Sequence, residues 1–349
     1  DLRGSLPRRH RFRAPELKAS LAHIMSSNDD VPSLGRLDAY QKIVATADPA
    51  ACITVHSCAG SGKSSTLAMR ARVLCEAGVP THRILLLTFS NRSCDDLTAK
   101  LAKVAPAVSC RTHHAHALAL LRASGHPQAS AAVVEPREQR AIIKEALARH
   151  APSQEKPTSK IVRKLLASFA KAKSTGLPQD LPHSVTDRRC FEDYQELLRQ
   201  RNQIDFEDMV GLAIEALRAH PTPLQHSHIL VDEAQDTSEK QLQLLQLLAP
   251  RGVVALTAVG DDDQTIYGFR GSRPDVLKRI GEQWGCHAYM LPTNYRCAPR
   301  VLDAARALIE GSLVRAQKPP LLAAAVAMGH GGGELRTVAF PDRATELDT

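Results

Sequence analysis

Ser57-Cys58-Ala59-Gly60-Ser61-Gly62-Lys63-Ser64 is the stretch that decides the fold of this chain. It follows a short apolar run at residues 52–56 and opens a run of helix formers at residues 66–76. The two glycines allow backbone N–H groups to surround phosphate oxygens at a helix N-terminus, where the helix dipole also favours negative charge. We therefore expect a phosphate-binding loop, in which Lys63 reaches the terminal phosphates and the Ser64 hydroxyl binds Mg²⁺.

The usual first glycine of this loop pattern is replaced by Ser57, so the match is not complete. The strand–loop–helix context nevertheless favours a phosphate site over a chance Gly/Ser turn. The residues expected to surround the nucleotide phosphates are Ser57, Cys58, Ala59, Gly60, Ser61, Gly62, Lys63, Ser64 and Ser65.

A second polar stretch, Asp232-Glu233-Ala234-Gln235-Asp236, comes directly after the apolar run at residues 229–231. An acidic pair at a strand end is usually solvated surface. Here the pair follows the phosphate loop by about 170 residues and is preceded by apolar residues, which favours a catalytic interpretation. We expect Asp232 to bind Mg²⁺ and Glu233 to polarise the attacking water.

The third stretch, at residues 260–271, combines a polar run with aromatic side chains. Gln264 is placed to sense the γ-phosphate, and Tyr267, Phe269 and Arg270 offer flat faces for nucleobases. The alternative is a buried aromatic pair in a hairpin. Because the chain has only 7 Phe, 5 Tyr and 1 Trp, two aromatics in one tight polar loop favour a nucleic-acid contact.

The pattern of apolar runs predicts an α/β fold with a parallel sheet. Runs apolar on both faces alternate with longer helical stretches, as expected for strands covered by helices on both sides. The alternation stops between about residues 111 and 204, where helix formers and prolines dominate, and this predicts a helical insertion. The expected strands are residues 52–56, 84–88, 228–231, 253–259, 287–291 and 334–340, and a Gly-rich turn is expected at residues 329–333.

Composition excludes several classes of protein. The 349 residues are 43% hydrophobic and 23% charged, and no apolar run approaches the ~18 residues of a membrane span. Half of the formal net charge of +8 lies in residues 1–18, so bulk charge says little about nucleic acid. Eight cysteines without a Cys-x-x-Cys pair disfavour a zinc ribbon and a secreted disulfide scaffold, and we expect an intracellular, reducing location.

Histidines at 113, 114 and 116 could suggest a metal cluster, but no cysteine or carboxylate accompanies them. We expect no metal there. The pair His226 and His228 lies at a strand entrance and is expected to be structural.

The ordered set of motifs resembles the N-terminal half of a superfamily 1 DNA helicase of the UvrD/Rep type. Besides the three stretches above, the segments that resemble the family, in its order, are Leu37-Asp38-Ala39-Tyr40-Gln41, Thr88-Phe89-Ser90-Asn91, Thr112-His113-His114, Asp205-Phe206-Glu207-Asp208 and Asn294-Tyr295-Arg296.

The resemblance implies an ATP- and Mg²⁺-dependent helicase or translocase that moves 3′→5′ along single-stranded DNA, with duplex junctions as partners, in repair, replication or recombination. It implies that Gln41 and Tyr295 frame the adenine and that Arg296 contacts the γ-phosphate. The residues implied to contact DNA are Thr88, Phe89, Asn91, His114, Tyr267, Phe269 and Arg270. No protein partner is indicated.

The resemblance also implies a domain organisation. We expect a basic lead-in at residues 1–35, a first RecA-like motor domain at 36–110 and 205–290, a helical insertion at 111–204, and the beginning of a second RecA-like domain at 291–349.

The sequence departs from the family in two respects. Ser65 and Thr66 follow the phosphate loop where an Arg is common, and the family's fifth and sixth motifs are absent from the 349 residues. We therefore expect ATP binding with feeble hydrolysis by this chain alone. The alternatives are a nucleotide- and DNA-binding fragment without effective turnover, or part of a helicase–nuclease subunit.

Overall fold

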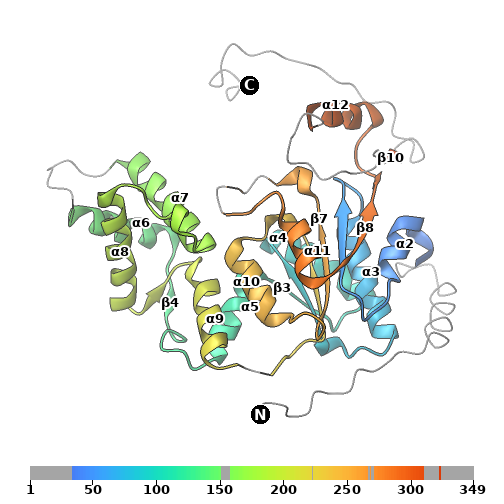
Figure 1. Ribbon diagram of the computed structural model, residues 1–349, viewed down its shortest axis with the longest axis horizontal. Helices are drawn as coiled ribbons and strands as arrows, with labels where there is room; N and C mark the ends of the chain where they lie inside the picture. Colours follow the sequence, from blue (N-terminus) through green and yellow to red (C-terminus); the bar gives the residue numbers. More distant parts are fainter. Residues whose placement is uncertain are drawn as a thin grey trace.

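One parallel sheet forms the centre of the molecule (Figure 1). The structure, a computed structural model, describes residues 34–150, 158–221, 223–265, 268, 271–309 and 322–323. Within these residues six strands run in the order β3-β2-β6-β7-β1-β8, and every neighbouring pair is parallel. The strands are β1 (Ile53–Ser57), β2 (Ile84–Thr88), β3 (Ser109–Thr112), β6 (His228–Val231), β7 (Ala255–Gly260) and β8 (His287–Leu291). The predicted α/β class with a parallel sheet is confirmed.

Apolar side chains cover both faces of this sheet, which is why its strands lack a simple alternating pattern. On one face Ile84 and Leu86 of β2 pack in a cluster with Leu67 of α3 (Lys63–Glu76) and Leu97 of α4 (Asn91–Val104). On the other face lie two helices with their own apolar cluster: Leu85, Leu87, Leu242, Leu245, Leu277 and Ile280. The sheet is thus the middle layer of three, and its carboxyl edge is left open to carry polar loops.

One helix of the part of the chain that carries the sheet was predicted with its bounds, at residues 66–76, and it is present as α3 (Lys63–Glu76). Helix α3 starts at Lys63, three residues before the predicted start, because the phosphate loop itself forms its first turn. The helices of this part are α2 (Ala39–Ala45), α3 (Lys63–Glu76), α4 (Asn91–Val104), α5 (His113–Ala123), α9 (Asp208–Ala219), α10 (Glu239–Leu248), α11 (Val276–Trp284) and α12 (Pro299–Ile309). Short 3₁₀ turns are η1 (Leu34–Arg36), η2 (Thr81–Arg83), η3 (Pro178–Asp180), η4 (Ala234–Asp236) and η5 (Asp262–Gln264).

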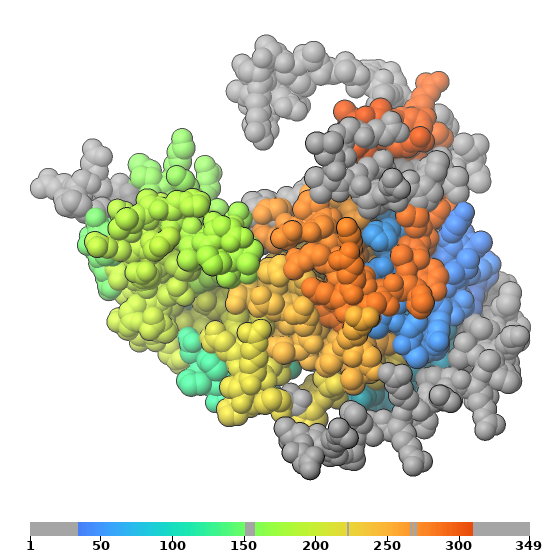
Figure 2. All heavy atoms as spheres, viewed as in Figure 1, coloured from blue at the N-terminus to red at the C-terminus, as the bar shows by residue number. Residues whose placement is uncertain are grey.

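Helices α6 (Pro136–Ala148), α7 (Ser159–Thr175) and α8 (Val185–Gln200) form a lobe beside the sheet (Figures 1 and 2). Phe169 packs against Phe191 and Tyr194 in the core of this lobe. The lobe is joined to the sheet by two chain segments whose short strands, β4 (Ala132–Val133) and β5 (Gln203–Ile204), pair in parallel.

The segment after β8 crosses the carboxyl edge of the sheet. There β9 (Thr293–Asn294) pairs with β10 (Leu322–Ala323). The expected strand at 334–340, the Gly-rich turn at 329–333 and most of the basic lead-in lie outside the described residues. None of the described helices combines the length and the apolar character needed to span a membrane.

Candidate functional site

The phosphate loop lies between β1 and α3, at the carboxyl edge of the sheet. Gly60 and Gly62 have φ values of 64° and 77°, in the left-handed region that favours glycine. A Cβ at Gly62 would lie 2.6 Å from the side-chain nitrogen of Gln41, so this approach also requires glycine. At the foot of the loop the Ser57 hydroxyl donates a hydrogen bond to the Gly260 carbonyl across 2.7 Å. The N-cap of α3 is Gly62, and no side chain caps this helix. The first N–H groups of α3 are therefore available to an anion.

The acidic pair lies directly beside this loop. Ser64 Oγ donates a hydrogen bond to Asp232 Oδ2 across 3.2 Å, and Lys63 Nζ lies 3.3 Å from Glu233 Oε2. Burial, with the neighbouring Glu233 carboxylate, raises the pKa of Asp232 to about 6, while the Lys63 charge opposes the shift. Asp232 Oδ1 is buried and has no hydrogen-bond partner among the described residues. These contacts bring together four predicted residues that lie about 170 positions apart in the sequence.

Glu233 is held in position by its backbone conformation and by Gln235. Its φ of 50° is unusual for a residue other than glycine and turns the backbone just after β6. Gln235 Nε2 donates a hydrogen bond to Glu233 Oε2 across 2.8 Å, and Gln235 Oε1 accepts one from the Asp261 backbone N–H at 2.9 Å. Gln264 Nε2 in turn donates to Asp261 Oδ2. Gln264 is thus connected to Glu233 through Asp261 and Gln235.

The two residues predicted to frame the adenine, Gln41 and Tyr295, both contact the backbone of the phosphate loop. Gln41 Nε2 donates a hydrogen bond to the Ser61 carbonyl across 2.8 Å, and the Tyr295 backbone N–H donates to the Gly60 carbonyl across 2.9 Å. The Tyr295 hydroxyl also donates to Asp38 Oδ2, the N-cap of α2. Segment 293–297 and the start of α2 are therefore tied together around the loop.

Asn294 and Arg296 also pack on the phosphate loop, at Ala59 and Gly60. Asn294 Nδ2 donates a hydrogen bond to the Ala59 carbonyl, and Asn294 Oδ1 accepts one from the Arg296 backbone N–H at 2.8 Å. A Cβ at Gly60 would lie 2.5 Å from Arg296 Cβ, so Arg296 is packed directly on the loop. The Cys58 thiol donates to the Pro292 carbonyl across 3.6 Å, whereas the Ser65 side chain is exposed.

The sequence did not single out Asp38, Gln235, Asp261 and Asn294 as site residues. All four act by holding another residue or the loop backbone. Each of the four lies in or next to one of the sequence motifs described above. That position is the one feature of the sequence from which their role could have been predicted.

A cavity of about 250 Å³ lies between the sheet-bearing body and the helical lobe. The rings of His114 and Phe206 stack in its wall, with centroids 3.8 Å apart and planes at 26°. Phe206 is 49% exposed, which is unusual for a side chain of its apolar character. The lining residues are Phe89, Ser90, Asn91, Thr112, His114, Ala170, Ser174, Phe206, Glu207, Asp236, Ser238 and Gln241.

Three of the predicted DNA contacts, Phe89, Asn91 and His114, thus meet in one cavity. Thr88 is fully buried at the end of β2 and does not line it. Tyr267, Phe269 and Arg270 lie outside the described residues. Phe206 was not predicted as a contact, although an exposed aromatic in the polar stretch 205–208 is a usable signal.

Asp236 belongs to the cavity wall and is also close to the phosphate loop. Burial, and then the charge of Glu233, raises the pKa of Asp236 to about 7, while Lys63 opposes the shift. The side chain is 7% exposed and its Oδ1 has no hydrogen-bond partner among the described residues. Residues 233–236 therefore lead directly from the acidic pair to the cavity.

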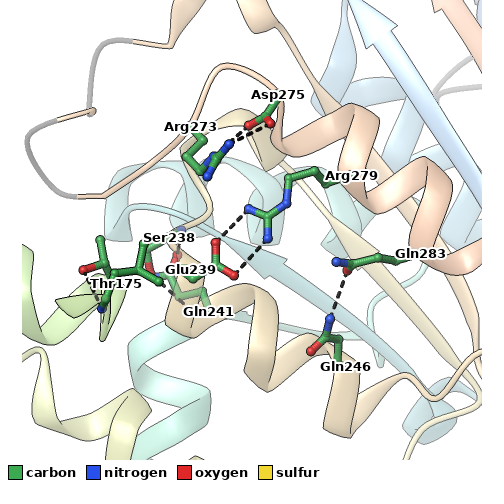
Figure 3. A network of polar contacts seen from close by, with 10 residues as sticks. Thr175, Ser238, Glu239, Gln241, Gln246, Arg273, Asp275, Arg279 and Gln283 are labelled. Carbon is green, nitrogen blue, oxygen red and sulfur yellow. Dashed lines mark hydrogen bonds and ion pairs between the residues drawn. The ribbon is translucent and has the colours of Figure 1, made fainter. Parts of the chain in front are cut away.

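Helices α10 and α11 are joined by a charged pair beside the segment at residues 271–275 (Figure 3). Arg279 makes two hydrogen bonds to the Glu239 carboxylate, at 2.7 and 2.9 Å, and Arg273 pairs with Asp275 at 2.9 Å. Gly271 has a φ of 84°, and a Cβ there would lie 2.5 Å from Thr175 Cγ2. The helical lobe and this segment are thus in close contact at the end of α7.

Two histidines beside His114, namely His113 and His116, are buried. Burial, together with neighbouring positive charge, lowers the pKa of His113 and of His116 to about 3, so both rings are neutral at physiological pH. His228 contacts the Pro49 carbonyl at 3.1 Å and the Ser227 hydroxyl at 2.9 Å. Within the described part of the chain, no group of three or more His, Cys, Asp or Glu side chains is arranged to hold a metal ion.

Comparison with known proteins identifies similar chains. The family model for the UvrD/REP helicase N-terminal domain matches residues 37–284. The ATP-dependent DNA helicase PcrA of Leuconostoc citreum is 30% identical over 284 residues, which are 74% of this chain and 37% of the relative. The PcrA helicases of Staphylococcus aureus strain Mu50 and Staphylococcus epidermidis are each 27% identical over 280 residues, covering 74% of this chain and 38% of the relative.

The chain spans less than two fifths of the length of these curated relatives. The family model covers more than half of the chain, from the start of the Gln41 segment to the end of α11. The chain therefore belongs to the UvrD/REP helicase N-terminal domain family.

Proposed function

We propose that this chain is the ATP-binding motor part of a DNA helicase or translocase that moves 3′→5′ along single-stranded DNA. The observation that carries the proposal is the cluster of Lys63, Ser64, Asp232 and Glu233 at the phosphate loop, which residues 233–236 connect to an aromatic-lined cavity. The curated relatives bear the name ATP-dependent DNA helicase, which supports the same reaction.

The donor set at the loop fits Mg²⁺. Asp232 offers a buried carboxylate oxygen without a hydrogen-bond partner among the described residues, and Ser64 offers a hydroxyl beside the second oxygen. Such hard oxygen donors suit this ion, which usually also keeps water and substrate phosphates as ligands. We assign Ser64 and Asp232 to Mg²⁺, which when bound neutralises charge on the phosphate oxygens.

In this proposal the loop binds the phosphates of ATP, and the acidic pair binds the metal ion and activates the attacking water. The backbone N–H groups after Gly60 and Gly62 hold the phosphates, and the Lys63 ammonium stabilises negative charge on the terminal phosphate. Glu233 accepts a proton from the attacking water, and its contact with Gln235 fixes the direction of that carboxylate. Gln41 and Tyr295 frame the base, and Arg296 contacts the γ-phosphate.

The cavity is the proposed single-strand path. Stacking on aromatic faces tolerates any base sequence, because every base has a flat face. The stacked pair His114 and Phe206 offers such a face, and Phe89 lines the same cavity. Asn91 adds a polar side chain there, and Thr88 anchors the preceding strand. Tyr267, Phe269 and Arg270 are proposed contacts from the sequence.

This assignment places the single-strand path between two parts of the chain. We assign residues 36–110 and 205–290 to the first motor domain, residues 111–204 to the inserted helical domain and residues 291–349 to a second motor domain. Duplex junctions would meet the protein at the ends of the path.

Coupling between ATP and DNA would follow two connections. Asp236 lines the cavity and its backbone N–H donates to the Glu233 carbonyl at 3.0 Å. The side chains of Gln264, Asp261 and Gln235 form the second connection to Glu233. A change of charge at the γ-phosphate thus reaches the cavity wall at Asp236 and the side chain of Gln264 through residues already in contact.

DNA-stimulated ATP hydrolysis by the full-length protein tests the proposal, with Lys63→Ala, Glu233→Gln and the wild type compared. Both variants should lose at least about 100-fold of the stimulated rate, since each removes a group that acts in phosphoryl transfer. Lys103→Ala, an exposed lysine on α4, is the control and should behave as wild type. Unchanged hydrolysis in Lys63→Ala would contradict the assignment. Tight ATP and DNA binding without turnover in the wild type would favour a binding module instead.

A further inference from the structure

Two cysteine thiols lie next to each other between α4 and β3. The Sγ atoms of Cys94 and Cys110 are 3.6 Å apart, within reach of a hydrogen bond. Both side chains are half-buried, and Cys110 belongs to the edge strand of the sheet. A disulfide has an S–S length of about 2.05 Å, so bond formation needs the two sulfurs to approach by only about 1.5 Å.

The two thiols belong to elements that carry the cavity wall. Asn91 begins α4 three residues before Cys94. Thr112 ends β3 two residues after Cys110, and His114 follows it in the first turn of α5. Asn91, Thr112 and His114 all line the cavity. Any bond between the sulfurs therefore connects two of the chain segments that line this cavity.

We propose that Cys94 and Cys110 form an oxidative modification site, in which a peroxide converts the dithiol to a reversible disulfide that weakens single-stranded DNA binding. The effect on DNA rests on the proposed function of the cavity. The first turn of α4 moves toward β3 when the bond forms, and Asn91 then moves relative to the His114 and Phe206 stack.

The reaction balances in two steps. The Cys94 sulfur attacks hydrogen peroxide, the O–O bond breaks, and one water and a sulfenic acid result. The Cys110 thiol then attacks the Cys94 sulfur, an S–S bond forms, and the hydroxyl leaves as a second water with the thiol proton. Two thiols are oxidised and one peroxide is reduced to two waters. Burial, with the charge of Cys94, raises the pKa of Cys110 to about 12, which assigns Cys110 to the second step.

The chain contains a matched control pair. Cys52 and Cys286 precede β1 and β8, which are neighbours in the sheet, and their thiols are hydrogen-bonded. They lie at the amino ends of these strands, opposite the edge that carries the phosphate loop and the cavity. Oxidation of this second pair should leave the cavity unchanged.

Tryptic peptide mapping tests the bond directly. Cleavage after Arg92, Lys100, Lys103 and Arg111 places Cys94 and Cys110 in separate peptides, residues 93–100 and 104–111. After hydrogen peroxide and alkylation of free thiols, we expect these peptides as one species that lacks two hydrogen atoms relative to their sum. A thiol reductant should restore the separate peptides. Absence of the linked species would overturn the proposal.

A titration of fluorescent single-stranded DNA in the same samples tests the consequence. Oxidised wild type should bind about fivefold more weakly than reduced wild type, as for the loss of one weak stacking contact. Cys94→Ser should be insensitive to peroxide, whereas Cys52→Ser should respond as wild type does. A linked species with unchanged or tighter DNA binding would overturn the proposal. Failure of the reduced protein to bind DNA would contradict the proposed function instead, and the peptide map would still decide the modification.

Discussion

Lys173 Nζ lies 2.6 Å from Asp205 Oδ2, and both side chains are almost completely buried, at 7% and 3% exposed. The same ammonium lies 2.8 Å from Asp208 Oδ1 and over the Tyr194 ring. Burial disfavours the charged ammonium, yet the two carboxylates raise the pKa of Lys173. This cluster joins α7 of the helical lobe to the segment that carries Phe206.

Replacing Lys173 should destabilise the protein strongly. Lys173→Met leaves two buried carboxylates without their cation, and the free energy of unfolding should fall by about 3–5 kcal/mol. Lys171→Met is a matched control on the same helix, because Lys171 pairs with Asp180 at a site where the lysine is 43% exposed. That control should cost at most about 1 kcal/mol. Equal losses in urea unfolding would show that the buried cluster has no special role.

Phe206 should matter for DNA and not for nucleotide. Phe206→Ala removes one ring of the stack with His114, so single-stranded DNA should bind about 5- to 100-fold more weakly, as for the loss of one stacked base. Nucleotide affinity should stay within about twofold, since Phe206 does not touch the phosphate loop. Val185→Ala, 70% exposed on α8, is the control. An unaltered DNA titration would remove the cavity from the proposed path.

Phe269→Ala is predicted from the sequence to weaken the binding of single-stranded DNA in the same way, with little loss of nucleotide affinity.

Asp236 should give the stability of the protein a specific pH dependence. Its pKa is raised to about 7 in the folded state, above the ordinary value of about 3.9. Between these values the folded state holds a proton that the unfolded state has lost, so the free energy of unfolding falls as pH rises through this window.

The Asp236→Asn variant isolates this effect. It lacks the titration, so it should gain stability relative to wild type as pH rises from about 5 to 8. Urea unfolding in metal-free buffer across this range measures the difference, with the exposed Asp96→Asn as control. A constant difference between Asp236→Asn and wild type would show that Asp236 does not titrate there.

Local pattern predicts much of the fold. The apolar runs at 84–88 and 228–231 coincide with β2 and β6 because these strands are buried on both faces. Strand β7 begins two residues later than predicted, because the turn at Arg251 and Gly252 leaves Val253 half exposed before the ladder begins. Strand β3 was not predicted, because its four residues, Ser109–Thr112, form a partly exposed edge strand and contain no apolar β-branched side chain.

Some residues of the candidate site could likewise be predicted from the sequence, and others could not. Lys63, Ser64, Asp232 and Glu233 could be named from the sequence because the chemistry of phosphate and Mg²⁺ restricts their type and order. Asn294 and Asp38 could not, because Asn294 holds the Ala59 carbonyl and Asp38 holds the Tyr295 hydroxyl, and these groups come close only in the folded chain. The stack of His114 on Phe206 joins residues 92 positions apart, and local pattern carries no such information.

Calorimetric titration of Mg²⁺–ATP into this chain tests the central claim most directly, with wild type, Lys63→Ala and the exposed control Lys103→Ala compared. The wild type and Lys103→Ala should bind with the same affinity. Lys63→Ala should bind at least about tenfold more weakly, since it loses a charge-assisted contact to the phosphates. Equal affinity of Lys63→Ala and wild type would contradict the assignment of the loop at residues 57–64 as the nucleotide site.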